Sequence, residues 1–317
     1  MAVSSGRAER ADETARAHGI AAHYADFEEM LDKENPDLVS IVTPPDQHFP
    51  MTMAALRRRI HVLCEKPFAL NVREAREMQA AAKQAGVVAM IDFEFRFVPA
   101  RAWAMELLKQ RYVGEVRMAD FGLHIGSRAQ SEDAGWDWWS DASRGGGILG
   151  AYGSHISDML RLMVGEPRRV FCDLVTFVRE RAGGIVTSDD GYTLLMEFQS
   201  GARAAVQMTV AAGVNDVRLG IFGTEGQLIM PDIYGNNLVG GKREGRTSGP
   251  IEIPDEYRLA REDHPLRAPF RALVTRMVHA IENHLPSPAP NFDDAIASQA
   301  ILDAARLSAR QGLWVEI

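Results

Sequence analysis

The sequence lacks the features that mark membrane, nucleic-acid-binding and disulfide-stabilised proteins. It contains no run of 18 apolar residues, so it predicts no membrane span. Its basic residues form no stripe and the net charge is -8, so we do not expect nucleic acid as a partner. The two cysteines, Cys64 and Cys172, lie far apart and without metal-ligand spacing. We therefore expect no metal site, no disulfide framework and a reducing, cytoplasmic location.

A glycine-rich phosphate-binding turn is also missing, although the first 96 residues otherwise resemble a dinucleotide-binding domain. Short apolar runs alternate with amphipathic stretches, which predicts parallel βαβ units. The predicted strands are 2–3, 38–42, 60–64 and 87–93, and the predicted helices are 8–18, 27–33, 50–58 and 72–85. The strand at 2–3 would be the second of a Rossmann fold. We therefore expect the domain to lack its first strand and its G-x-G-x-x-G turn, roughly 30 residues in a βαβ unit.

The rest of the chain has a different pattern. Helices are predicted at 100–110, 149–163, 269–284 and 293–311, and strands at 115–122, 170–179, 191–199, 202–210, 216–222 and 227–230. Residues 126–145 and 235–265 are predicted to be loops. The fold class is α/β, with an N-terminally truncated Rossmann domain over 1–96 and an α/β domain over 97–317. The second domain has an open, mostly antiparallel sheet, and we expect its last helix to pack back on the first domain.

Lys66 is the first candidate for chemistry. It lies in Glu65-Lys66-Pro67, directly after the strand predicted at 60–64. This is the carboxyl edge of a parallel sheet, where open α/β folds bind ligands. A lysine held near a cofactor can have a lowered pKa and act as a general acid or base. The Lys66–Pro67 bond could be cis. The alternative is an ordinary solvated lysine.

His155 and Asp158 follow Gly145-Gly146-Gly147 in the sequence. Residues 151, 155 and 158 share one face of a helix, which permits a proton relay through His155 with Asp158 orienting it. The alternative is a packed histidine with a satisfied partner. The glycines either let the backbone approach a ligand closely or leave the loop mobile.

The tip after the first strand bears on the choice of cofactor. It reads Ser4-Ser5-Gly6-Arg7, without the acid that would bind the 2′-hydroxyl of NAD. Serine hydroxyls and an arginine suit the 2′-phosphate of NADP, and NAD stays possible. The alternative is a polar turn that caps the next helix.

Three tryptophans, Trp136, Trp138 and Trp139, lie in the predicted polar loop. They could form a wall on which the apolar face of a sugar stacks. A dimer contact or a small separate core fits them equally well.

Together these residues resemble the Gfo/Idh/MocA oxidoreductase family over nearly the whole chain. The matching segments are Tyr24-Ala25-Asp26, Thr43-Pro44-Pro45 with His48, His61 to Pro67, Arg96-Phe97 with Pro99, Gly145 to Asp158, Gly223 to Gly226, and Ser308 with Trp314-Val315. The resemblance implies hydride transfer between nicotinamide and a CH–OH carbon of a sugar, cyclitol or related polyol. It implies that Lys66 and His155 are catalytic.

On this basis we assign two groups of binding residues. The cofactor group is Ser4, Ser5, Arg7, Thr43, Pro44, Pro45, His48, Glu65, Lys66, Pro67 and Arg96. The substrate group is Lys66, Trp136, His155 and Asp158. One position departs from the family pattern, because the aspartate of its Asp-x-x-x-His element falls at Ala151. The relay must then rest on Lys66 and His155, with Asp92, Asp158 or water as further candidates.

Two expectations concern the whole protein. A sheet with helices on only one face leaves a broad apolar face, so we expect a homodimer or homotetramer built on that sheet. The alternative to an NADP-preferring enzyme is a non-catalytic family member that binds a ligand or a partner.

Overall fold

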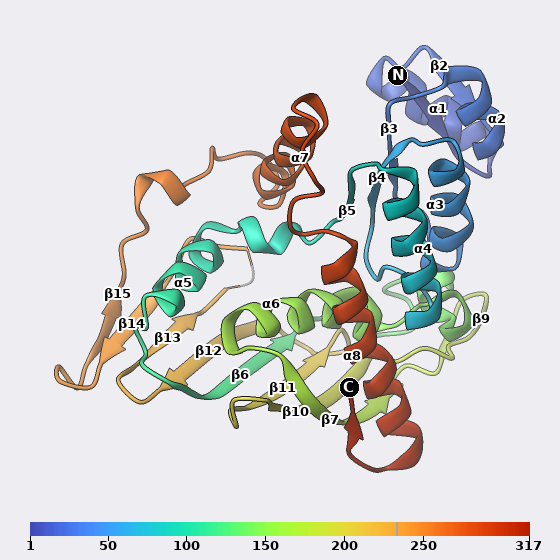
Figure 1. The fold of residues 1–317 in the computed structure, drawn as a ribbon. Coiled ribbons are helices and arrows are strands. Elements are labelled where there is room, and N and C mark those ends of the chain that lie inside the picture. The colour runs from blue at the N-terminus through green and yellow to red at the C-terminus, as the bar shows by residue number, and fades with distance from the viewer. Residues whose placement is uncertain (233) are drawn as a thin grey trace.

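The computed structural model describes residues 1–232 and 234–317, arranged as Figure 1 shows. Its N-terminal part contains strands β1 (Ala2–Ser4), β2 (Ala22–Tyr24), β3 (Leu38–Ile41), β4 (His61–Cys64) and β5 (Ala89–Ile91). The helices between them are α1 (Ala8–His18), α2 (Phe27–Glu34), α3 (His48–Arg57) and α4 (Val72–Ala85). The alternation of strand and helix follows the predicted pattern. Strand β2 has no predicted counterpart, because three residues with an exposed histidine at the centre make no apolar run.

The strands of this part form two separate parallel ladders in the described residues. Strand β1 pairs with β2, and β3, β4 and β5 pair in that order. Between β1 and β3 lies a cavity of about 1450 Å³, lined by residues 1–7 on one side and 38–44 on the other.

The second part is built on a mixed sheet, which has nine strands among the described residues. Their order is β15-β14-β13-β12-β6-β11-β10-β7-β16. The bounds are β6 Val116–His124, β7 Pro167–Val175, β10 Gly191–Phe198, β11 Arg203–Thr209, β12 Asp216–Gly223, β13 Gly226–Met230, β14 Val239–Lys242, β15 Ser248–Pro250 and β16 Val315–Glu316. Only β6 and β11 pair in parallel among these neighbours. A small hairpin, β8 (Glu180–Arg181) and β9 (Gly184–Ile185), lies apart from this sheet.

One prediction for this part was wrong, and another differs in the type of helix. Residues 235–265 contain β14 and β15 rather than only loop. Strand β14 reads Val-Gly-Gly-Lys, so it carries no side-chain alternation and is held through backbone pairing with β13. The helix predicted at 149–163 begins with a π-helical segment, Leu149–Gly153, before α6 (Ser154–Val164). Such segments often occur at functional sites.

Helices cover one face of the sheet. Figure 1 shows α5 (Pro99–Lys109), α6 and α8 (Phe292–Gln311) on the same side, with α7 (Arg267–Glu282) near β5. Side chains such as Leu194, Met196 and Val206 point from the sheet into this core. Helix α8 also reaches the N-terminal part, where the Asp303 carboxylate accepts a hydrogen bond from the Val72 amide at 2.7 Å. It therefore packs against both parts of the chain.

The opposite face of the sheet has a mixed character. Leu195 and Met118 are exposed on it, beside ion pairs such as Arg203 with Glu197. Nowhere in the described residues is there a helix both long and apolar enough to cross a membrane.

Candidate functional site

The loop after β4 holds Lys66 at the carboxyl edge of the three-stranded ladder. The Lys66–Pro67 peptide bond is cis. The lysine side chain is 24% exposed, and its Nζ lies 3.9 Å from Oε2 of Glu65. The Glu65 carboxylate also accepts a hydrogen bond from the Lys66 amide at 3.1 Å. Lys66 is therefore a partly buried cation, and the interpretation as an ordinary solvated lysine does not fit its surroundings.

The pKa of Lys66 is raised, whereas the sequence interpretation allowed a lowered one. Burial alone would lower this pKa, but the negative charges of Glu65, Glu94 and Asp92 outweigh burial. Lys66 therefore carries its proton at neutral pH. In that state it can donate a hydrogen bond to a substrate oxygen and stabilise negative charge there.

His155 lies on the first turn of α6, directly after the π-helical segment. Its ring stacks on Phe95, with centroids 3.9 Å apart and planes inclined by 14°. The side chain is 2% exposed, and its Nδ1 has no hydrogen-bond partner in the described residues. Burial lowers the pKa of His155 well below its ordinary value, and the Lys66 and Arg101 cations lower it further. The ring is a neutral imidazole whose Nδ1 has no partner in the described residues, not a packed histidine with a satisfied partner.

Two buried carboxyl groups face this lysine and histidine. Asp92 and Glu94 follow β5, and each has one carboxylate oxygen without a hydrogen-bond partner in the described residues. Burial and mutual repulsion raise the pKa of Asp92 to about 9. Burial also raises the pKa of Glu94 to about 7, although the Lys66 charge opposes that shift. Buried acids with raised pKa values are typical of proton-transfer sites.

Sequence reasoning named Asp92 only as a possible helper and missed Glu94. The predicted strand at 87–93 included Asp92 and ended directly before Glu94, whereas β5 ends at Ile91. A signal was available, because an acid directly after a parallel strand lies at the same sheet edge as Lys66.

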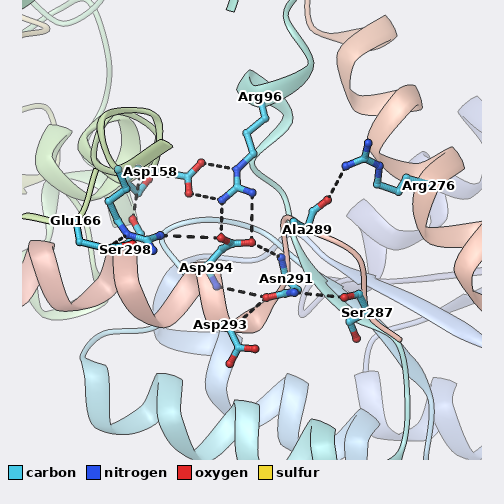
Figure 2. Close-up of polar contacts among 12 residues, drawn as sticks. Arg96, Asp158, Glu166, Arg276, Ser287, Ala289, Asn291, Asp293, Asp294 and Ser298 are labelled. Atoms are coloured by element: carbon cyan, nitrogen blue, oxygen red, sulfur yellow. Dashed lines mark hydrogen bonds and ion pairs between the residues drawn. The ribbon is translucent and has the colours of Figure 1, made fainter. Parts of the chain in front are cut away.

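Arg96 and Asp158 bind each other, which corrects the predicted orienting role of Asp158. The Arg96 Nε donates to Asp158 Oδ2 at 2.7 Å, and Nη2 of Arg96 lies 2.9 Å from Oδ1 of Asp294 (Figure 2). Arg96 and Asp158 are 8% and 1% exposed. Asp158 therefore pairs with the arginine and does not orient His155, while the cofactor contact of Arg96 stays a prediction. The three residues instead fasten the loop after β5 to α6 and α8.

His48 also has a different role from the predicted cofactor contact. Its Nε2 lies 2.8 Å from the carbonyl oxygen of Thr43, and its Nδ1 lies 2.9 Å from that of Pro67. The ring is fully buried. His48 therefore ties the loop after β3 to the Lys66–Pro67 loop and positions both.

The predicted cofactor residues of the first strands line one cavity. Ser4, Ser5 and Arg7 line it from the end of β1, and Thr43 and Pro44 line it from the end of β3. Hydroxyls, a guanidinium and an open strand end are a donor set that fits the adenosine and phosphate groups of a dinucleotide. No glycine-rich turn enters the cavity from the described residues. Pro45, which was also predicted to contact the cofactor, does not line this cavity and is buried against Gly145.

Close backbone approach explains the glycines before α6. A Cβ at Gly146 would lie 2.4 Å from the carbonyl oxygen of Trp139, and one at Gly147 would lie 2.3 Å from Oδ1 of Asp189. Arg144 then pairs with Asp46 at 3.0 Å, which joins this loop to the segment after β3. The glycines therefore serve tight packing rather than loop mobility.

Of the tryptophans, Trp139 is packed against the core and Trp136 is partly exposed. Trp139 packs against the main core and lies under Arg128. Trp136 donates its Nε1–H to the carbonyl oxygen of Ile185 at 2.9 Å and stays 37% exposed. Its predicted substrate contact stays a prediction. In the described residues no cluster of His, Cys, Asp and Glu side chains has the arrangement of a metal site.

Comparison with known proteins identifies relatives over the whole chain. Residues 1–93 match the model of the oxidoreductase family with an NAD-binding Rossmann fold, and residues 102–229 match the GFO/IDH/MocA C-terminal domain. An uncharacterized oxidoreductase of Synechocystis sp. is 29% identical over 322 residues, which span 97% of this chain and 86% of that protein. An oxidoreductase domain protein from Kribbella flavida has a TM-score of 0.89 and 30% identity, covering 99% of this chain and 89% of its own. A levoglucosan dehydrogenase in complex with NADH and levoglucosan has a TM-score of 0.91 and 25% identity, and the match covers 100% of this chain and 90% of that chain.

Proposed function

We propose a function from one premise: the chain belongs to the Gfo/Idh/MocA oxidoreductase family. It is a nicotinamide-dependent dehydrogenase that acts on a CH–OH carbon of a sugar, cyclitol or related polyol. The observation that carries the proposal is that charged Lys66, after β4, lies near enough to neutral His155, on α6, to lower its pKa, and that buried Glu94 lies 3.7 Å from the same imidazole. The solved relative that binds NADH and levoglucosan supports the substrate class.

Lys66 and His155 have different roles in the proposed reaction. A bound nicotinamide would accept or supply the hydride. Lys66 donates a hydrogen bond from Nζ to the reacting oxygen and stabilises its developing negative charge. His155, as a neutral imidazole, accepts the hydroxyl proton during oxidation and returns it during reduction. The neighbouring Phe95 ring holds the imidazole in place and excludes water from that side.

A substrate panel tests this function directly. Sugars, cyclitols and anhydrosugars should be assayed with NAD and NADP in the oxidising direction, and NADH fluorescence should be titrated with the protein. We expect cofactor binding and turnover of at least one member of the panel. Cofactor binding without any turnover would favour a non-catalytic ligand-binding role, and the absence of both would remove the proposal.

We infer a preference for NADP over NAD. The cavity end formed by Ser4, Ser5 and Arg7 offers hydroxyls and a cation to a 2′-phosphate. Ser5→Asp should move kcat/KM toward NAD, because the added carboxylate repels the phosphate and can accept from a ribose hydroxyl. Ser131→Asp, at an exposed loop position, is the matched control. An unmodified enzyme that strongly favours NAD would contradict the inference.

Self-association through the uncovered sheet face is part of the proposal. Leu195 is 38% exposed on that face, and Leu162 is 43% exposed on α6. Light scattering at micromolar concentration should give a dimer or tetramer. Leu195→Arg should shift it toward monomer by placing an unpaired charge in the apolar contact, whereas Leu162→Arg should not. A monomeric wild-type protein would exclude this arrangement.

We also propose a cytoplasmic location. Cys64 and Cys172 are both free and buried, which fits a reducing compartment. Fractionation of cells that express the full gene product would test it.

A further inference from the structure

A carboxylate outside the family's Asp-x-x-x-His element lies beside His155. Oε2 of Glu94 is 3.7 Å from Nε2 of His155. The glutamate follows β5 and the histidine lies on α6, so two distant segments bring them together. Both side chains are buried, and neither Oε2 of Glu94 nor Nδ1 of His155 has a hydrogen-bond partner in the described residues. Buried polar atoms are seldom left unpaired, and those that are need a functional or structural reason.

The family pattern holds its carboxylate at a different place. That position is Ala151 in this chain, whose methyl side chain cannot take up a proton. We propose that Glu94 is the carboxylate of the proton relay here, reaching His155 from the β5 side in place of a side chain at position 151. The inference rests on the proposed dehydrogenase function and adds a residue to it.

The relay balances for oxidation of a CH–OH group. The substrate O–H bond breaks and its proton goes to Nδ1 of His155, and a bound nicotinamide would take the C–H electron pair as hydride. Nε2 of His155 then gives its own proton to Oε2 of Glu94. The imidazole ends neutral and Glu94 ends protonated. Lys66 is unsuited to accept this proton, because it is already protonated at neutral pH.

The surroundings of Glu94 suit a group that exchanges a proton near neutral pH. The titratable and charged groups that act on it or lie beside it are Glu65 and Lys66 after β4, Asp92 after β5, Arg101 on α5, His155 on α6 and Tyr234 after β13. Burial raises the pKa of Glu94 to about 7, and Asp92 holds its proton to higher pH. Since ionised Glu94 is the acceptor, oxidation should become faster as the pH rises through about 7.

Kinetics of Glu94→Gln test the relay. We expect kcat for oxidation to fall about 10²-fold, at the lower end of what acid–base catalysis contributes, and the rise in rate near pH 7 to disappear. Glu106→Gln, the same change on the outer side of α5, should alter neither. Adding Ala151→Asp to Glu94→Gln should recover about tenfold of the loss, because it restores a carboxylate one turn before His155.

A measurement on the cofactor-free protein is independent of turnover. The imidazole ¹⁵N signals of His155, assigned by their loss in His155→Gln, should shift near neutral pH as Glu94 ionises. The shift should vanish in Glu94→Gln and persist in Asp92→Asn. A merely structural glutamate would not produce the matched loss of this shift and of the kinetic pH dependence.

The outcomes separate the relay from the proposed function. A folded Glu94→Gln with wild-type kcat and pH profile overturns the relay. If the wild type oxidises no substrate, the proposed function fails, and a His155 shift that survives Glu94→Gln then overturns the relay as well. If Glu94→Gln does not fold, Glu94→Asp replaces it. Withdrawing the carboxylate by one methylene should lower kcat, and an unchanged kcat overturns the relay.

Discussion

Lys66→Met should lower turnover of the proposed dehydrogenase by about 10²–10³-fold, the range found when a group that stabilises developing negative charge is removed. Methionine keeps the length and most of the packing of the lysine but removes its charge and its hydrogen-bond donor. The substrate oxygen would then develop negative charge without the cation that lies beside Glu65 and Glu94. The measurement is kcat with a substrate identified from the panel. KM should change less, because the charge develops mainly in the transition state.

Two further variants serve as comparisons for Lys66→Met. Lys109→Met, at an exposed position near the end of α5, should leave turnover unchanged. His155→Ala should have a milder or comparable effect to Lys66→Met, since it removes the proton acceptor but leaves the stabilising cation. A folded Lys66→Met protein with wild-type turnover would remove Lys66 from the catalytic role.

The Lys66 side of the site could be predicted because its determinants are local. An apolar run followed by Glu65-Lys66-Pro67 predicts a strand end, and parallel strands bring their carboxyl ends to one edge. The same local pattern located β3 and the loop at Thr43, and periodicity located α4 and α8 within a residue or two.

The other side of the site depends on contacts that no local pattern encodes. Glu94 and His155 are 3.7 Å apart in space, yet they belong to different units of the sequence. Arg96, Asp158 and Asp294 come from three separate elements. From the sequence alone, a conspicuous arginine or aspartate near the site is as compatible with binding a ligand as with binding another residue. Burial decides between the two, and burial is a property of the tertiary fold.

The β14–β15 edge illustrates a different limit. Glycine-rich segments carry no hydrophobic alternation, so sequence periodicity cannot distinguish a strand from a loop there. The strands form because β13 offers an unpaired edge. Such pairing depends on the neighbouring strand and not on the segment itself.

Arg96→Met should destabilise the fold by about 3–5 kcal/mol, the cost of removing one partner from a buried ion pair. The change leaves the Asp158 carboxylate, which is 1% exposed, without its cation, and it weakens the hold on Asp294 at the start of α8 (Figure 2). Urea unfolding followed by circular dichroism would measure the loss. Arg73→Met is the matched control, because Arg73 pairs with Glu77 on the exposed face of α4 and such pairs contribute about 0.3–0.5 kcal/mol.

A double variant distinguishes a lost ion pair from lost packing. Arg96→Met combined with Asp158→Leu removes both charges, so no carboxylate is left buried without a cation at position 158. The double variant should therefore be more stable than Arg96→Met alone, since replacing a buried pair by apolar groups is often close to neutral. If Arg96→Met costs no more than Arg73→Met, the network does not fasten α6 and α8 to the loop after β5. If the cost is large but Asp158→Leu does not relieve it, the loss comes from packing of the Arg96 side chain rather than from the stranded charge of Asp158.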